Sequence, residues 1–160
     1  MKKITYLIIS IIFLNFINAC AGYKPIYIQN LQFKIADHSI KANKKLGRQI
    51  YSKLYNLSKS NKNNTEIQSI TIIIASTKNK NATVKDSAGK ILEYKIILST
   101  EVYIKDFKNG DEILNETFVS SATYKTQDQQ SETVNLENKS IDNLINNIYQ
   151  KLLIKLSQYI

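Results

Sequence analysis

The fold is decided by residues 91–124, which read ILEYKIILSTEVYIKDFKNGDEILNETFVSSATY. In the first half, apolar residues recur at every second position and share their parity with Thr100: Tyr94, Ile96, Leu98, Val102 and Ile104. The opposite parity carries Lys95, Ser99, Glu101, Tyr103 and Lys105. This alternation is typical of an antiparallel strand with one buried face. Asn109-Gly110 then predicts a tight hairpin turn with positive φ at both residues.

The strand after this turn is predicted to run antiparallel from about Glu112 to Tyr124. Its inward positions are Leu114, Phe118, Ala122 and Tyr124, and its outward positions are Asn115, Thr117, Ser121 and Thr123. The polar stretch from Lys125 to Glu132 is expected to end the strand.

Two more strands are predicted before the hairpin. Residues Leu31 to Ala36 alternate, and the segment from Glu66 to Ser76 places Ile70, Ile72 and Ile74 on one face. The following segment, Thr77 to Lys90, is polar and includes the turn-prone Asp86-Ser87-Ala88-Gly89. We therefore expect it to be an exposed connection.

Two amphipathic helices complete the pattern. The first follows a predicted N-cap at Asp37 or Ser39 and buries Leu46, Ile50, Leu54 and Leu57; the polar run Ser58 to Asn64 then reads as a loop. The last carries the stripe Ile141, Leu144, Ile145, Ile148, Leu152 and Leu156. Asp142 near its start, and Lys151 and Lys155 near its end, suit the helix dipole. The stripe is also compatible with a partner helix, but the sheet needs a cover.

The predicted order is therefore β-α-β-β-β-α, with one apolar face on each element. The economical packing is an α+β sandwich of two layers. We expect a four-stranded mixed, mostly antiparallel sheet with two helices on one face.

The N-terminal residues predict export. Lys2-Lys3 precedes an apolar run from Ile4 to Ile17, which is too short to span a bilayer, and Asn18-Ala19-Cys20 follows. Cys20 is the only cysteine, so it has no disulfide partner within the chain. We predict a lipoprotein signal peptide at 1–19, cleavage after Ala19, and a single periplasmic domain at 20–160 that acylated Cys20 anchors to the membrane.

Two alternatives remain open for this segment, because Ile17 and Asn18 depart from the usual lipoprotein pattern. The segment would then be an ordinary signal peptide cut nearby, or an uncleaved anchor, and Cys20 a free thiol. Ala21, rather than an aspartate, follows Cys20. That residue favours sorting to the outer membrane over retention in the inner membrane.

Charge argues for anionic partners other than nucleic acid. Of 22 basic residues, Lys2 and Lys3 leave with the signal, so 20 face 13 acidic residues, a formal charge of +7. Arg48 is the only arginine, and nucleic-acid binding would require arginines and aromatics interleaved on one surface. An anionic lipid or glycolipid is the better partner. Lys78, Lys80, Lys85 and Lys90 are the candidate phosphate contacts, and the alternative is that they are simply solvated.

Enzymatic chemistry finds no support in the sequence. The single histidine, His38, lies beside the predicted start of the first helix, where a capping or surface role is expected. No metal motif or glycine-rich phosphate loop is present, and Asp106, Asp111 and Glu112 bracket a turn. We expect no catalytic residue, metal or cofactor.

Two regions together resemble a known family. The segment Cys20-Ala21-Gly22-Tyr23-Lys24-Pro25-Ile26-Tyr27 is similar to the Cys-Gly-Phe-x-Pro-Leu-Tyr opening of alphaproteobacterial LPS-assembly lipoproteins, the LptE (RlpB) family, with one inserted residue. The C-terminal part also resembles that family, which places an aromatic-containing strand, here Phe118 to Tyr124, before a polar stretch and a last helix. The family shares the β-α-β-β-β-α order.

This resemblance implies a non-enzymatic outer-membrane component of lipopolysaccharide export. Such a protein sits in the lumen of the LptD β-barrel as plug and assembly partner, in an expected 1:1 complex. It helps the barrel acquire its disulfides and can bind lipopolysaccharide. Another reading is an outer-membrane lipoprotein that binds lipid for a different intermembrane transport system, or a pilotin for a different barrel.

Overall fold

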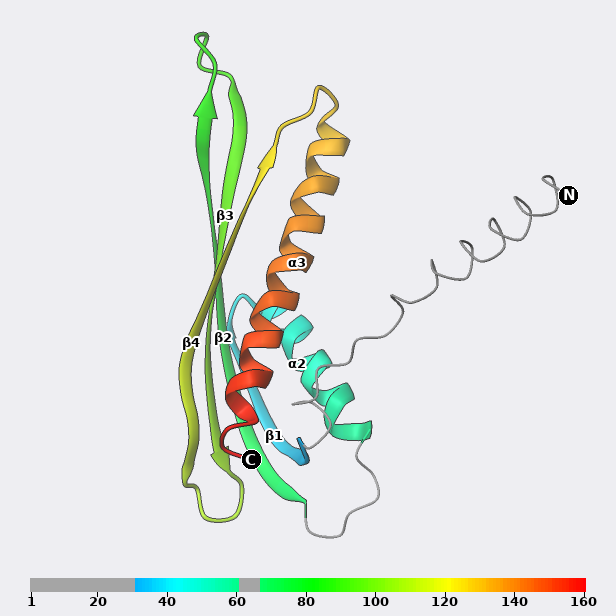
Figure 1. Ribbon diagram of the computed structural model, residues 1–160, viewed down its shortest axis with the longest axis vertical. Helices are drawn as coiled ribbons and strands as arrows, with labels where there is room; N and C mark the ends of the chain where they lie inside the picture. Colours follow the sequence, from blue (N-terminus) through cyan, green and yellow to red (C-terminus); the bar gives the residue numbers. More distant parts are fainter. Residues whose placement is uncertain (1–30, 61–66) are drawn as a thin grey trace, which may run out of the picture.

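The computed structural model describes residues 31–60 and 67–160, and it confirms the predicted α+β fold (Figure 1). Both helices lie on one face of a four-stranded mixed sheet. The elements are β1 (Phe33–Ala42), α2 (Lys44–Ser60), β2 (Gln68–Lys85), β3 (Ile91–Asp106), β4 (Glu112–Lys125) and α3 (Gln130–Leu156).

The sheet order is β1-β2-β3-β4, with β1 parallel to β2 and the other pairs antiparallel. β2 and β3 pair along almost their whole length, whereas β1 reaches only from Gln68 to Ser76 of β2. The upper part of the sheet in Figure 1 therefore has three strands covered by α3 alone, and the lower part has β1 and α2 in addition.

The core lies between the sheet and the helices, as the alternation predicted. The buried apolar side chains of β2, β3 and β4 share one parity and meet the apolar stripes of both helices. They are Ile70, Ile72, Ile74, Ile96, Leu98, Val102, Ile104, Leu114 and Phe118 from strands, and Leu46, Ile50, Leu54, Leu144, Ile145, Ile148, Leu152 and Leu156 from helices. Ser76 and Thr100 interrupt this core with hydroxyls 3.1 Å apart. The two hydroxyls satisfy each other's need for a partner.

The first strand and the first helix begin later than predicted. β1 continues to Ala42, so Asp37 and Ser39 lie within a strand, and the N-cap is Asn43, whose Oδ1 accepts a hydrogen bond from the Leu46 amide at 3.2 Å. A β-bulge between Ile35 and Asp37 explains the error. The bulge shifts the inward positions by one residue. The alternation of apolar residues is therefore interrupted at the bulge, although the strand continues through it.

The predicted connection from Thr77 to Lys90 is wrong for most of its length. β2 continues to Lys85, and only Asp86 to Gly89 forms the turn, with Gly89 at φ 82°. Side chains of this part of β2 contact little of the core, which is why its composition reads as a loop. The backbone nevertheless pairs with β3, and ladder hydrogen bonds do not depend on apolar side chains.

The second hairpin is confirmed, but its turn is not of the predicted type. Only Gly110 has positive φ, at 79°. The Asp106 amide donates to the Asp111 carbonyl oxygen at 2.8 Å, and the Asp106 carboxylate accepts from the amides of Lys108 and Asn109. These bonds close a four-residue loop, which needs one left-handed residue instead of two.

The last helix starts three turns earlier than predicted, at Gln130. Its first turns carry few apolar side chains, and the sequence therefore does not predict a helix there. Thr133 anchors this part, because its hydroxyl accepts a hydrogen bond from the Gln127 amide at 2.8 Å and is buried.

The first helix approaches the sheet closely at Gly47. A Cβ atom there would lie 2.5 Å from Cγ2 of Ile40 on β1. The absence of a side chain therefore sets the distance between α2 and this strand.

Candidate functional site

The face of the sheet that points away from α2 and α3, called here the uncovered face, is one candidate surface. As predicted, the outward residues Asn115, Thr117, Ser121 and Thr123 of β4 are exposed there. Their partners on β3 and β2 continue the same face, and the outward cross-strand rows are Thr77–Ser99–Val119, Asn79–Ile97–Ser121 and Asn81–Lys95–Thr123. The face is rich in hydroxyl and amide groups, and neither of the two described helices, α2 and α3, covers it (Figure 1).

A shallow depression lies in the lower part of this face. It has a volume of about 270 Å³ and is lined by Lys41, Ile73, Ala75, Glu101, Tyr103 and Asn115. Apolar Ile73 and Tyr103 lie side by side as a cross-strand pair, surrounded by polar groups. The depression could therefore receive one protruding side chain of a partner.

The four predicted lysines do not form one site. Lys78 and Lys80 lie on the helix side of β2, where both bind Glu137 of α3, at Nζ–Oε distances of 3.0 and 2.6 Å. Tyr124 donates its hydroxyl to Glu137 at 3.0 Å, and the Lys80 ammonium lies 4.2 Å from the ring centre of Tyr94. This cluster ties the upper part of α3 to the sheet.

The cluster perturbs its own ionisation. The hydrogen bond from Lys80, reinforced by those from Lys78 and Tyr124, lowers the pKa of Glu137 to about 2. Burial alone would lower the pKa of Lys80, but the hydrogen bonds to Glu137 and Tyr124 outweigh it and raise the pKa. Both groups therefore stay charged at neutral pH.

Sequence reasoning missed Glu137, Tyr94 and Tyr124 as partners of these lysines. Glu137 lies on the same helix as the apolar stripe, which would have placed it on α3. Because the sequence predicts that this helix starts near Asp142, Glu137 is not expected to belong to it. The link is long-range, between residues 57 or more positions apart.

The other two lysines lie at the tip of the β2–β3 hairpin. Lys85 is exposed at the end of β2, and Lys90 follows the turn, with its Nζ 3.9 Å from the exposed carboxylate of Asp128. Val84 and Leu92, 45% and 39% exposed, lie beside them in sequence. The tip therefore offers ammonium groups next to apolar side chains.

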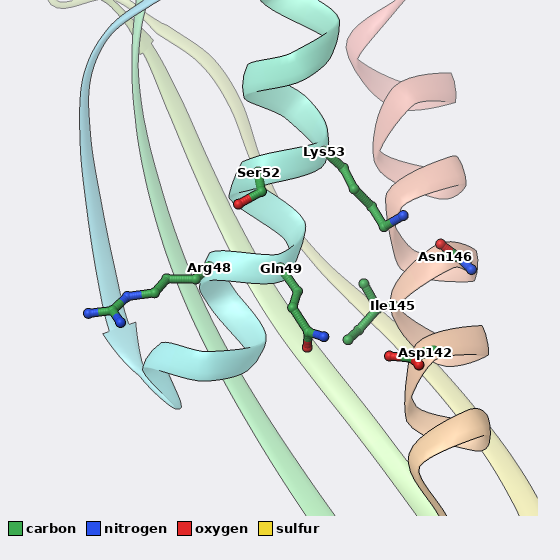
Figure 2. A pocket seen from close by; sticks show the side chains of 7 residues that line it. All are labelled: Arg48, Gln49, Ser52, Lys53, Asp142, Ile145 and Asn146. Carbon is green, nitrogen blue, oxygen red and sulfur yellow. The ribbon is translucent and has the colours of Figure 1, made fainter. Parts of the chain in front are cut away.

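A groove between the two helices is shown in Figure 2, with a volume of about 360 Å³. Gln49 and Lys53 of α2 point toward Asp142 and Asn146 of α3, and Arg48 points away from them. Within the described part of the chain, the buried Gln49 Oε1 has no hydrogen-bond partner. Six of the seven residues that line the groove are polar or charged, and Ile145 is the exception, whereas lipid-binding pockets are lined mainly by apolar side chains.

The remaining sequence predictions lie elsewhere. Cys20 and Ala19 are outside the described residues. His38 lies on β1 instead of beside a helix start, and its exposed ring stacks on Tyr51 at 4.1 Å between ring centres. In residues 31–60 and 67–160, no three His, Cys, Asp or Glu side chains gather as metal ligands. No helix among the same residues is long and apolar enough to cross a membrane.

Comparison with known proteins places the fold among bacterial lipoproteins. No family model and no curated protein sequence matches the chain. Among solved structures, a candidate lipoprotein from Caulobacter crescentus matches with a TM-score of 0.54 at 14% identity, over 78% of this chain and 88% of that one. A minor lipoprotein from Acinetobacter baumannii matches with a TM-score of 0.53 at 16% identity, over 79% and 92%.

A third solved structure agrees with these two. The uncharacterized lipoprotein B from Nitrosomonas europaea has a TM-score of 0.53 at 15% identity, and the match covers 76% of this chain and 82% of that one. At these identities the likeness shows a shared fold. The chain has the fold of these bacterial lipoproteins.

Proposed function

We propose that this protein is an outer-membrane lipoprotein of the LptE type, acting as plug and assembly partner of an LptD-like β-barrel in a 1:1 complex. The observation that carries the proposal is the uncovered sheet face, which presents hydroxyl and amide groups over three long strands. The wall of a wide barrel lumen is polar, so the hydroxyl and amide groups of this face can hydrogen-bond to it. Lys95 and Glu101 on the same face would need partners of opposite charge on that wall.

The anchor belongs to the same proposal. Acylated Cys20 would hold the protein to the periplasmic leaflet of the outer membrane, and cleavage after Ala19 would free its amine for a further acyl chain. Mass spectrometry of the N-terminal peptide should therefore find acyl chains on Cys20 in the wild type and none in the Cys20→Ser variant. A wild-type N-terminal peptide without acyl chains would contradict lipid anchoring.

Lipopolysaccharide contact is proposed for the hairpin tip. Lys85 and Lys90 are exposed, and Val84 and Leu92 beside them could meet acyl chains while the ammonium groups meet phosphates. Lys78 and Lys80 are weaker candidates, because Glu137 already neutralises part of their charge. The role is one of binding and assembly, without catalysis.

The second candidate is a lipoprotein that binds lipid for another transport system or acts as pilotin for another barrel. The polar groove between α2 and α3 is poorly suited to hold acyl chains. This is why the barrel partnership is preferred.

The test is recovery of the barrel from outer membranes in mild detergent with tagged protein, followed by mass spectrometry. Thr117→Arg, on the uncovered face, should reduce recovery of a near-stoichiometric barrel. Asn56→Arg, on the exposed surface of α2, is the matched control and should leave recovery unchanged. Circular dichroism checks that both variants fold.

Three outcomes would count against the proposal. Equal recovery of the barrel with both variants would show that the uncovered sheet face is not part of the interface. Absence of any barrel, with the wild-type protein intact and membrane-bound, would favour the lipid-binding alternative. A barrel whose disulfides form normally after depletion of this protein would argue against the assembly role.

A further inference from the structure

Among residues 31–60 and 67–160, no strand pairs with the outer side of the upper part of β2. β1 ends at Ala42, which has φ 57°, and the chain turns away into α2. The last bond on this side runs from the Asn43 amide to the Ser76 carbonyl oxygen at 2.9 Å. From Thr77 to Lys85, β2 pairs only with β3.

Alternation along the strand shows which backbone groups are free. The Ser69 carbonyl oxygen accepts from Phe107 at the end of β3, whereas that of Ser76 faces β1. Up to Ala82, odd positions therefore pair toward β3 and even positions face the open side, so Lys78, Lys80 and Ala82 direct N–H and C=O groups outward. Register shifts on either side of Val84 break the alternation beyond this point. No other described strand lies along these groups. An unpaired edge of this length is a template for another strand.

The opposite edge of the sheet, β4, is contacted by side chains of α3. On β4, Lys151 of α3 donates to the Val119 carbonyl oxygen at 2.8 Å. Lys155 pairs with Glu116 of the same strand at 3.4 Å. Lys151 thus occupies one carbonyl oxygen of the β4 edge, whereas on β2 the ammonium groups of Lys78 and Lys80 bind Glu137 on the helix side of the sheet.

A hollow adjoins the open edge on its helix side. It has a volume of about 360 Å³ and lies between the start of α2, at Asn43 and Lys45, and α3. Lys78 lies on its wall, and α3 contributes Asn138 and the two carboxylates of Glu137 and Asp142. This is where β1 stops while α3 continues (Figure 1). A strand added along β2 would therefore find room for its inward side chains.

We propose that this edge, Thr77 to Lys85, binds an extended acidic segment of a partner protein as an additional strand, placed end to end with β1. The segment contains three lysines and no acidic residue, and Lys45 adds a fourth positive charge beside it. Backbone hydrogen bonds would give affinity. Glu137 and Asp142 balance two of these four positive charges, and the two that are left over would select for carboxylates. A second copy of this chain is disfavoured, because edge-to-edge pairing would set lysines against lysines.

The probe is a synthetic seven-residue peptide, Thr-Glu-Val-Glu-Val-Glu-Thr, added to the isotope-labelled protein isolated from membranes in mild detergent. Amide exchange measured by NMR should slow at Lys78, Lys80 and Ala82. It should not change at Asn79 and Asn81, which already pair with β3. This alternate pattern distinguishes strand addition from general charge attraction.

Two matched peptides and two variants sharpen the test. The peptide with lysine in place of each glutamate, and the acidic peptide with alternate N-methyl amides, should both fail to protect the edge. Ala82→Pro removes one outward N–H and should weaken the acidic peptide roughly tenfold, whereas Ala82→Ser should not. If Ala82→Pro does not fold, the N-methylated peptide still tests whether backbone hydrogen bonds are needed, because it leaves the protein unchanged.

Equal binding of the lysine or N-methylated peptide would overturn the proposal. So would unchanged exchange at Lys78, Lys80 and Ala82 with the acidic peptide at millimolar concentration. Concentration-dependent dimers in sedimentation that Ala82→Pro abolishes would replace the acidic partner with a second copy. The test does not involve the barrel and is independent of the proposed function.

Discussion

Glu137→Gln is the most informative single change, because it removes one charge that two lysines and a tyrosine share. The pKa of Glu137 falls from an ordinary 4.5 to about 2 on folding. Each pKa unit corresponds to about 1.4 kcal/mol, so the full difference corresponds to about 3 kcal/mol of stability at neutral pH. Lys78 and Lys80 are 30% and 33% exposed, and solvent screens them. We therefore expect a loss of about 1–2 kcal/mol.

The pH dependence follows from the direction of the shift. A lowered pKa in the folded state stabilises the protein above pH 4.5, and that stabilisation is lost as the pH falls toward 2. The wild type should therefore lose stability between about pH 5 and 2 more steeply than Glu137→Gln. At pH 3 the two proteins should differ by less than half of their difference at pH 7.

The assay is urea unfolding followed by circular dichroism at pH 7 and pH 3. Glu116→Gln is the matched control, because Glu116 pairs with Lys155 at 3.4 Å but both side chains are about 40% exposed. That exposed pair should contribute at most about 0.5 kcal/mol. Equal effects of the two substitutions at pH 7, or a Glu137→Gln effect that does not shrink at pH 3, would refute the reasoning.

Two further predictions concern packing and can be measured by the same unfolding assay. Gly47→Ala should destabilise the protein by about 1 kcal/mol, because its Cβ would lie 2.5 Å from Ile40 Cγ2. In an Ile40→Ala background the same change should instead stabilise by about 1 kcal/mol through helix propensity, and a loss in both backgrounds would contradict the close-approach argument. Thr100→Val should cost about 1–3 kcal/mol by leaving the Ser76 hydroxyl unpaired in the core. Adding Ser76→Ala should restore most of this loss, and additive losses would show that the hydroxyl pair is not the cause.

Most of the fold can be predicted from the sequence, because apolar residues alternate with polar ones at every second position in the central strands. The parity of Ile96, Leu98, Val102 and Ile104 identified β3 and its buried face, and the outward residues of β4 identified the uncovered face. Burial of apolar side chains is the dominant stabilising term there, so the pattern of side chains and the pattern of structure coincide.

The candidate sites at the upper end of the sheet cannot be predicted from this alternation. Lys78 and Lys80 looked like loop residues because backbone pairing with β3, and not burial, makes them part of a strand. Their contact with Glu137 joins residues 57 or more positions apart in sequence.

By itself, then, the sequence determined the layers, the strand parities and the N-terminal anchor prediction. Each of these depends on residues that are neighbours along the chain. Only the tertiary structure decided where β1 ends, where α3 begins and which lysines form ion pairs with Glu137. Those outcomes depend on backbone ladders, a one-residue bulge and long-range ion pairs, and none of these leaves a periodic trace in the side chains.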